Sequence, residues 1–368
     1  MNYKSLAFLC FLSITSSVEA EKQSDLSLQC SESNGESCVE LGIMYGLGTG
    51  AIQNIPKAVD LLQKGCDLKV GNGCYNLAFI YAKGLGVPKD EAKALKFYQQ
   101  GCNLNEGGSC NNLGLIYANG VGVEKDNAKA AEFYKKACDL NDEQSCNNLG
   151  LMYLDGTLVK KDDLKAVELF TKACALNGGV GCYHLAVMYS NGRGVLNDNI
   201  KTARFYQKAC DLKVGLGCYH LGFMYEKGVG VKKDFFKAVE LYKVACEFGD
   251  ANSCNNLGIM YETGEGVDQN LSTSQKFYRT ACDLDHGNGC YYLGQVYDNG
   301  LGVSENDAKA FELYEKACFL KIGGACNDLA ILYGTGSGVR QNLSKAKEFF
   351  GKACSLQFEN GCINYSTF

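Results

Sequence analysis

Apolar side chains in this chain recur at the spacing of an α-helix. In one representative stretch, Cys110, Leu113, Gly114 and Tyr117 stand at positions i, i+3, i+4 and i+7, and residues with this spacing form one apolar stripe along a helix. Gly120 follows and is expected to end the helix, because glycine accepts the left-handed conformation of a helix C-cap. The pattern predicts a short amphipathic helix that ends before this glycine.

A second helix is predicted to begin shortly after the glycine. Its first position is Asp126, and only Asp or Asn stands there in the other copies: Asn54, Asp90, Asp162, Asp198, Asp234, Asn270, Asn306 and Asn342. Such side chains accept hydrogen bonds from the free amides of a first turn. Tyr134 and Ala137 continue the buried face as far as Cys138. Lys129 is not explained by the helix dipole, which favours acidic residues near a helix start.

The whole pattern recurs with a period of 36 residues, so that Leu113-Gly114 and Tyr117 reappear as Leu293-Gly294 and Tyr297. A fixed period of this length is typical of a solenoid, in which each helix pair buries its apolar face against its neighbours. We therefore predict an all-α solenoid. Its parts are an N-terminal partial cap at residues 21–37, nine 36-residue repeats at residues 38–361 and a C-terminal partial cap at residues 362–368.

Cysteines occur in pairs that are eight residues apart, and no repeat lacks its pair. The pairs are Cys30/Cys38, Cys66/Cys74, Cys102/Cys110, Cys138/Cys146, Cys174/Cys182, Cys210/Cys218, Cys246/Cys254, Cys282/Cys290, Cys318/Cys326 and Cys354/Cys362. Structural zinc sites favour spacings of two to four residues and usually include histidine, so we favour disulfides. Each would join a second helix to the next first helix and stabilise the fold by about 2.5 kcal/mol on the chain-entropy model.

The N-terminus resembles a secretory signal peptide. Lys4 precedes a short apolar run at residues 5–14, and Val18-Glu19-Ala20 offers a small-residue cleavage site, as signal peptides do. Removal of residues 1–20 would also remove Cys10, the odd cysteine of twenty-one. The remaining even set is typical of an oxidising compartment. We expect a secreted or periplasmic protein with no membrane span.

The net charge of −5 is spread along the repeats without a basic stripe. Phosphate binding requires clustered Lys and Arg, so nucleic acid is not an expected partner. We expect a monomer.

The repeated motif resembles that of a known repeat family. The sequence Cys-x-x-Leu-Gly-x-x-Tyr-x-x-Gly-x-Gly-Val, followed by Asp-x-x-Lys-Ala and a Tyr-x-Lys-Ala-Cys segment, resembles Sel1-like repeats, which are relatives of the tetratricopeptide repeat. With a cysteine pair in every repeat, the chain is similar to the Helicobacter cysteine-rich protein family. The resemblance implies a right-handed α/α superhelix whose concave surface contacts other proteins, in this organism's envelope or in a host. The resemblance also implies β-lactamase or penicillin-binding activity.

A binding groove is predicted from the stripe that starts two residues after the second cysteine of each pair. In stacked helix pairs the first helices usually line the concave side, where solenoids commonly bind partners. Asn can donate to a peptide carbonyl and accept from a peptide amide, so we expect a peptide or protein partner here. The alternative is that these side chains only cap turns or hydrate the helix surface. The predicted groove residues are Asn76, Asn112, Asn148, His184, His220, Asn256, Tyr292 and Asp328.

The alternative function is weak hydrolysis or binding of penicillin and cephalosporin derivatives, which only the resemblance implies. Ser344 and Lys347 form a Ser-x-x-Lys motif, but the companion motifs Ser-Asp-Asn and Lys-Thr-Gly are absent from the sequence, so no catalytic residue is assigned. Of the three histidines, His184 and His220 share a repeat position and are interpreted as groove lining rather than as a metal or acid/base pair. No cofactor or metal is expected.

Overall fold

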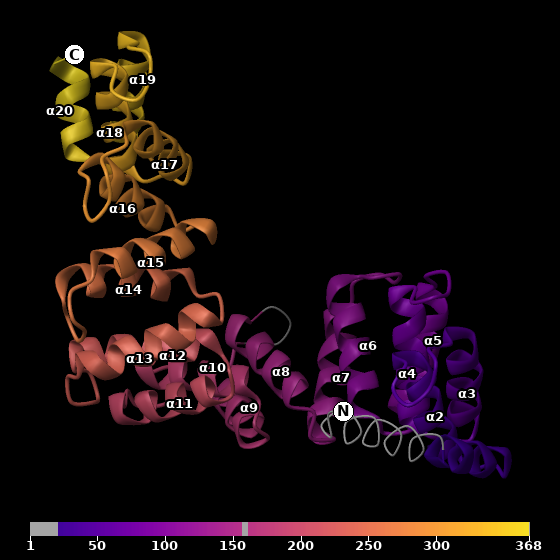
Figure 1. Ribbon diagram of the computed structural model, residues 1–368. Helices are drawn as coiled ribbons and strands as arrows, with labels where there is room; N and C mark the ends of the chain where they lie inside the picture. Colours follow the sequence, from indigo (N-terminus) through magenta and orange to yellow (C-terminus); the bar gives the residue numbers. More distant parts are fainter. Residues whose placement is uncertain (1–20, 157–160, 368) are drawn as a thin grey trace, which may run out of the picture. The chain divides into compact units, whose positions relative to one another are not determined.

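The computed structural model describes residues 21–156 and 161–367, and within these residues the regular structure is helical (Figure 1). Residues 21–31 form a helix that precedes the first pair. The first helices of the pairs are α2 Gly35–Leu47, α4 Gly71–Lys83, α6 Gly107–Asn119, α8 Glu143–Asp155, α10 Gly179–Asn191, α12 Gly215–Lys227, α14 Ala251–Thr263, α16 Gly287–Asp298, α18 Gly323–Thr335 and α20 Glu359–Thr367. The second helices are α3 Ile55–Asp67, α5 Glu91–Asn103, α7 Asn127–Asp139, α9 Asp163–Ala175, α11 Asn199–Asp211, α13 Phe235–Glu247, α15 Leu271–Asp283, α17 Asp307–Phe319 and α19 Leu343–Ser355. The all-α helix-pair solenoid predicted from the period is confirmed. The proposed signal peptide, residues 1–20, lies outside the described residues.

The predicted caps explain where these helices begin and end. Asp126 Oδ1 accepts a hydrogen bond of 3.0 Å from the Lys129 amide at the start of α7, and Gly120 ends α6 with φ 71°. The Lys129 ammonium lies 5.3 Å from the centre of the Tyr117 ring and 3.5 Å from Asp126. Because the ring face and the N-cap carboxylate both attract this cation, they account for a lysine that the helix dipole disfavours. The same Lys–Tyr contact recurs at Lys93/Tyr81, Lys165/Tyr153, Lys201/Tyr189, Lys237/Tyr225, Lys309/Tyr297 and Lys345/Tyr333.

Small residues on the first helices let an aromatic ring of the second helix pack between them. A Cβ atom at Gly114 would lie 2.5 Å from the Tyr134 ring, and one at Gly258 would lie 2.4 Å from the Tyr278 ring. At these two positions the distances are too short for any side chain larger than hydrogen. Ala78, Ala186 and Ala330 stand at the same position in other repeats, so packing requires a small residue after the leucine. The tyrosines themselves are almost fully buried.

Disulfides form at the predicted spacing. Nine pairs are bonded with Cα–Cα distances of 4.3–4.9 Å, and Cys174 and Cys182 are disulfide-bonded as well. Eight of these bonds join the end of a second helix to the next first helix, and Cys30–Cys38 joins the helix at residues 21–31 to α2. The intervening turn contains a residue in the left-handed conformation, such as Asn141 with φ 66° or Lys321 with φ 67°. This conformation was not predicted from the sequence.

The second cysteine of a pair lies in the core and not on the surface. It begins the apolar stripe of its first helix, and in nine of the pairs its side chain is 0% exposed. These cysteines were predicted to form disulfides, and they are disulfide-bonded. A fully buried disulfide cannot contact a partner, so these residues serve packing and covalent stapling alone. The nine cysteines are Cys38, Cys74, Cys110, Cys146, Cys182, Cys218, Cys254, Cys290 and Cys326.

The contacts divide the chain into two compact units: unit 1 ends at Gly181 and unit 2 begins at Cys182. Within unit 1, successive first helices contact one another, α2 with α4, α4 with α6 and α6 with α8. The first helices of unit 1 therefore lie side by side. None of the described helices is both long enough and apolar enough to cross a membrane.

Candidate functional site

We define the first-helix face of unit 1 by the side chains two, five and nine positions after the second cysteine of each pair. These are Asn76, Phe79 and Lys83 on α4, Asn112, Leu115 and Asn119 on α6, and Asn148, Leu151 and Asp155 on α8. Phe79 and Leu115 are 39% and 38% exposed. Large apolar side chains that are exposed near one another mark candidate contact surfaces.

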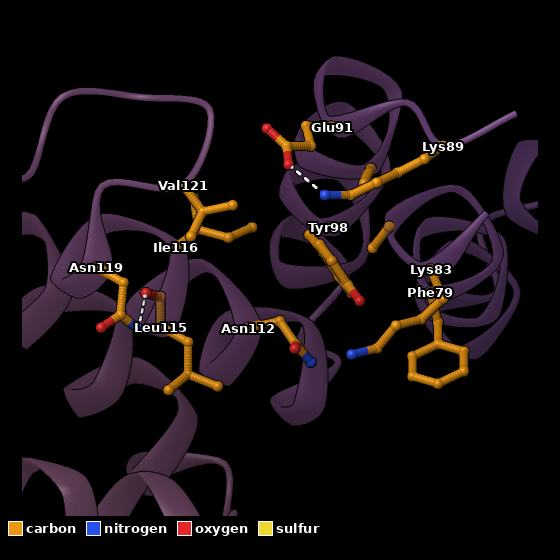
Figure 2. A pocket seen from close by; sticks show the side chains of 12 residues that line it. Phe79, Lys83, Lys89, Glu91, Tyr98, Asn112, Leu115, Ile116, Asn119 and Val121 are labelled. Atoms are coloured by element: carbon orange, nitrogen blue, oxygen red, sulfur yellow. Dashed lines mark hydrogen bonds and ion pairs between the residues drawn. The ribbon is translucent and has the colours of Figure 1, made fainter.

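A pocket of about 370 Å³ opens on this face between α4, α5 and α6 (Figure 2). We call it the Tyr98 pocket. Phe79, Leu115, Ile116 and Val121 supply its apolar walls. The polar groups that line it are Lys83, Lys89, Glu91, Tyr98, Asn112 and Asn119. Such a mixture of apolar walls and a few polar groups is typical of ligand sites.

Some polar groups of the Tyr98 pocket already have an ion-pair or hydrogen-bond partner within the protein, and others have none among the described residues. Lys89 makes an ion pair of 2.7 Å with Glu91, whereas Lys83 makes none with the residues that the structure describes. Tyr98 is only 3% exposed, and burial raises the pKa of its hydroxyl well above the ordinary value. Within the described part of the chain, no group makes a hydrogen bond with that hydroxyl.

A second pocket, of about 410 Å³, adjoins the first because Leu115 lines both. We call it the Asn148 pocket. Glu143, Asn147, Asn148 and the segment 178–181 line it as well. Asn147 is 7% exposed, and its buried Oδ1 finds no hydrogen-bond partner among the residues described. A buried polar atom without a partner is costly, so this pocket contains an unused acceptor.

The three predicted groove residues of unit 1 are all partly exposed. Asn112 and Asn148 each line one pocket, whereas Asn76 lines neither. The Nδ2 atoms of Asn76 and Asn112 donate 2.8 Å hydrogen bonds to the carbonyls of Asn72 and Gly108, and Asn148 Nδ2 lies 3.4 Å from Asn111 Oδ1. In Asn112 this bond uses one of the two amide N–H groups, so the other N–H and the Oδ1 remain for a ligand.

The five predicted groove residues of unit 2 are partly buried as well. His184 and His220 come together on the Tyr183 ring, with centroid distances of 5.3 Å and 5.8 Å. Burial lowers the pKa of His220. The Tyr292 ring packs at a tilt against the Tyr278 ring, with the ring centres 5.3 Å apart. The Tyr291 hydroxyl donates a 3.0 Å hydrogen bond to Asp328. Asn256 stands at the predicted groove position of α14.

Unit 2 contains a set of tyrosine–carboxylate pairs that the sequence analysis missed. The Tyr242 hydroxyl donates to Glu226 at 2.7 Å, Tyr278 donates to Glu262 at 2.5 Å, and Tyr314 donates to Asp298 at 3.0 Å. Each acid stands eight residues after the second cysteine of its pair, a position that is Gly46, Ala82, Ala118 or Leu154 in unit 1. An acid at this position followed by a tyrosine sixteen residues later is the signal that could have identified the pairs.

No catalytic constellation forms around the residues considered for an enzyme. Ser344 is exposed on the first turn of α19, and the Lys347 ammonium lies 5.9 Å from the Tyr365 ring. His286 caps α16, where its Nδ1 accepts a hydrogen bond from the Gly289 amide. Over residues 21–156 and 161–367, no group of three His, Cys, Asp or Glu is arranged to hold a metal ion.

Comparison with known proteins relates this geometry to a family. The Sel1 repeat model matches residues 35–70, 71–106, 108–142, 143–178, 179–214, 215–250, 251–286, 287–318 and 324–358. No curated protein sequence matches the chain. The chain is similar to cysteine-rich protein B of Helicobacter pylori, with 36% identity over 38% of this chain and 100% of that protein, at a TM-score of 0.31.

Two further solved structures are similar over most of the chain. One is a protective antigen present in uropathogenic Escherichia coli strains, with TM-score 0.69 and 25% identity over 90% of this chain and 79% of that chain. The other is a Sel1 repeat protein from Oxalobacter formigenes, with TM-score 0.63 and 22% identity over 82% of this chain and 87% of that chain. The resemblance inferred from the repeated motif is confirmed. The chain belongs to the Sel1 repeat family.

Proposed function

We propose that this protein is an exported scaffold that binds an extended segment of a partner protein along the first-helix face of unit 1. The observation that carries the proposal is the pair of adjoining pockets that meet at Leu115. Asn112 and Asn148, one in each pocket, are the polar groups selected from the sequence. Sel1 repeats are typical of proteins that contact other proteins, which supports this class of function.

An extended peptide matches the chemistry of this face. Phe79 and Leu115 offer apolar contact to side chains. Asn112 Oδ1 can accept a hydrogen bond from a peptide amide, and the N–H that is not bonded to Gly108 can donate to a peptide carbonyl. Apolar anchors give such complexes most of their affinity, while polar groups fix the register of the peptide backbone.

The cysteine chemistry supports export. All twenty cysteines from Cys30 to Cys362 are disulfide-bonded, and disulfides persist in oxidising compartments such as the periplasm and the extracellular space. Identification of the partner will show whether it belongs to the cell envelope or to a host.

The proposal is tested by selecting peptides on the oxidised protein from a phage library of random twelve-residue sequences. Synthetic versions of the selected peptides are then titrated by fluorescence anisotropy. We expect Phe79→Glu and Leu115→Glu each to weaken binding at least tenfold, because a charge in an apolar contact loses the burial energy of a hot-spot residue. Phe236→Glu is the matched control, since Phe236 is 66% exposed but lies on a second helix.

Equal affinity for wild type, Phe79→Glu and Leu115→Glu would show that the peptides bind elsewhere and would refute the proposal. An equal loss of peptide affinity in Phe236→Glu would also refute the proposal. Circular dichroism of each variant confirms that the helices are intact.

A further inference from the structure

Two repeats carry the same pair of side chains, one in unit 1 and one in unit 2, so the two copies can be compared. Tyr242 on α13 and Lys227 on α12 occupy the same repeat positions as Tyr98 on α5 and Lys83 on α4. The surroundings are also alike, because Phe223 on α12 is the counterpart of Phe79, and both phenylalanines are exposed. Other lining positions differ, among them Glu91 and Val121, which are Phe235 and Glu265 in unit 2. The difference that concerns the tyrosine and the lysine directly lies at the position before the lysine.

In unit 2 that position is Glu226, whose carboxylate binds the Tyr242 hydroxyl and the Lys227 ammonium at the same time. Glu226 Oε2 accepts the hydrogen bond of the Tyr242 hydroxyl at 2.7 Å, and Oε1 lies 2.5 Å from the Lys227 ammonium. A hydroxyl and an ammonium placed about a carboxylate in this way form charge-assisted hydrogen bonds, which are the strong class. The chain thus shows which ligand group a Tyr–Lys pair of this geometry accepts.

In unit 1 the corresponding residue is Ala82, which has no carboxylate. Tyr98 and Lys83 remain, and both line the Tyr98 pocket (Figure 2). In that figure the tyrosine hydroxyl and the lysine ammonium point into the same part of the pocket, beside Asn112. The Tyr98 side chain is almost fully buried and, among the described residues, its hydroxyl has no hydrogen-bond partner.

We propose that Lys83 and Tyr98 bind the carboxylate of an Asp or Glu side chain of the partner segment, in the position that Glu226 fills within unit 2. This inference rests on the proposed function and adds the chemistry of the partner. One oxygen of the ligand carboxylate accepts from the Tyr98 hydroxyl, and the other pairs with the Lys83 ammonium.

Charge supports an acidic ligand group. Because Glu91 already neutralises Lys89, Lys83 is the cation of this pocket without an ion pair among the described residues. Burial raises the pKa of Tyr98, so its hydroxyl stays protonated and acts as a donor at neutral pH. A side-chain carboxylate fits better than a chain terminus, since the Asn148 pocket continues the face beyond Leu115 and leaves room for the peptide to run on.

The experiment uses a phage library whose twelve-residue peptides are fused at their C-terminus to the coat protein, so that only side chains can supply a carboxylate. We expect enrichment of Asp or Glu next to an aliphatic residue. The consensus peptide, synthesised with a C-terminal amide, is then titrated against variants by fluorescence anisotropy. Lys83→Met and Tyr98→Phe should each weaken binding about tenfold to hundredfold, the range for hydrogen bonds to a charged group.

Two matched controls distinguish this site from a general charge effect. Lys227→Met removes the lysine at the same repeat position, where Glu226 already pairs it, and should leave the affinity unchanged. Ala82→Glu should abolish binding by supplying the carboxylate from the chain itself, whereas Ala82→Gln should retain more of it.

Selection of peptides without an acidic residue, or failure to select any peptide, would overturn the inference. An unchanged affinity for Lys83→Met would do so too. Peptides that lack acid but still depend on Leu115 would refute the carboxylate site and leave the proposed function standing. Loss of binding in both Leu115→Glu and Lys83→Met, with full binding in Lys227→Met, is the result that supports both.

Discussion

Asp328 shows how one side chain can change the pH response of a repeat. Its equivalents in other repeats include Asn76, Asn112, Asn148 and Asn256, which carry no charge. Burial raises the pKa of Asp328 above the ordinary value of 3.8, although hydrogen bonds from Asn327 and Tyr291 act in the opposite direction. The folded protein therefore holds the proton of this carboxyl more tightly than the unfolded chain does. Its contribution to stability is full below pH 3.8 and is lost as the pH rises through the raised pKa.

Asp328→Asn should remove this loss of folding stability at higher pH, because an amide does not ionise. The amide Oδ1 can still accept the hydrogen bond that Tyr291 donates to Asp328 at 3.0 Å. We expect the variant to have a higher melting temperature than the wild type at pH 7 and a melting temperature close to the wild type's at pH 3.5. Thermal melts by circular dichroism across this range test the expectation. Asp139→Asn, an exposed carboxylate at the end of α7, is the control, and an identical pH profile for Asp328→Asn and wild type would contradict the account.

At the scale of the elements, the turn between a second helix and the next first helix is the most uniform feature. A residue in the left-handed conformation stands in all ten of these turns in the described chain, and it is a non-glycine in nine of them, with φ between 58° and 69°. One turn uses Gly249 instead, with φ 85°. A side chain in this conformation costs roughly 1 kcal/mol, so the disulfide and the cap hydrogen bonds hold these turns against a local preference.

Lys321→Gly should therefore stabilise the protein by about 0.5–1 kcal/mol, because glycine enters the left-handed conformation without strain. The converse change, Gly249→Ala, should destabilise it by about 1 kcal/mol. No atom lies within 4 Å of a Cβ at Gly249, so the effect would come from the backbone alone. Urea unfolding of the oxidised variants measures both values. Destabilisation by Lys321→Gly would show that its side chain contributes more than the strain costs.

At the scale of the whole molecule, the sequence period predicted the helices, their caps and the cysteine pairs, because each depends on neighbours within one repeat. The Tyr98 pocket could not be predicted in this way. It depends on an alanine at residue 82 and a tyrosine sixteen residues later, on different helices, and only the packing of α4, α5 and α6 brings them together. Similarly, the groove asparagines were identified by position, but their hydrogen bonds to the helix backbone became apparent only with side chains in place.

The most direct test of the central claim is to locate where a peptide lies on the molecule. A photoreactive p-benzoylphenylalanine is placed at position 115 in one variant and at position 236 in another, and each is irradiated with the selected peptide bound. We expect cross-linked peptide from position 115, where the two pockets of unit 1 meet, and none from position 236 on a second helix. Cross-linking from position 236 with none from position 115, identified by mass spectrometry, would contradict binding on the first-helix face.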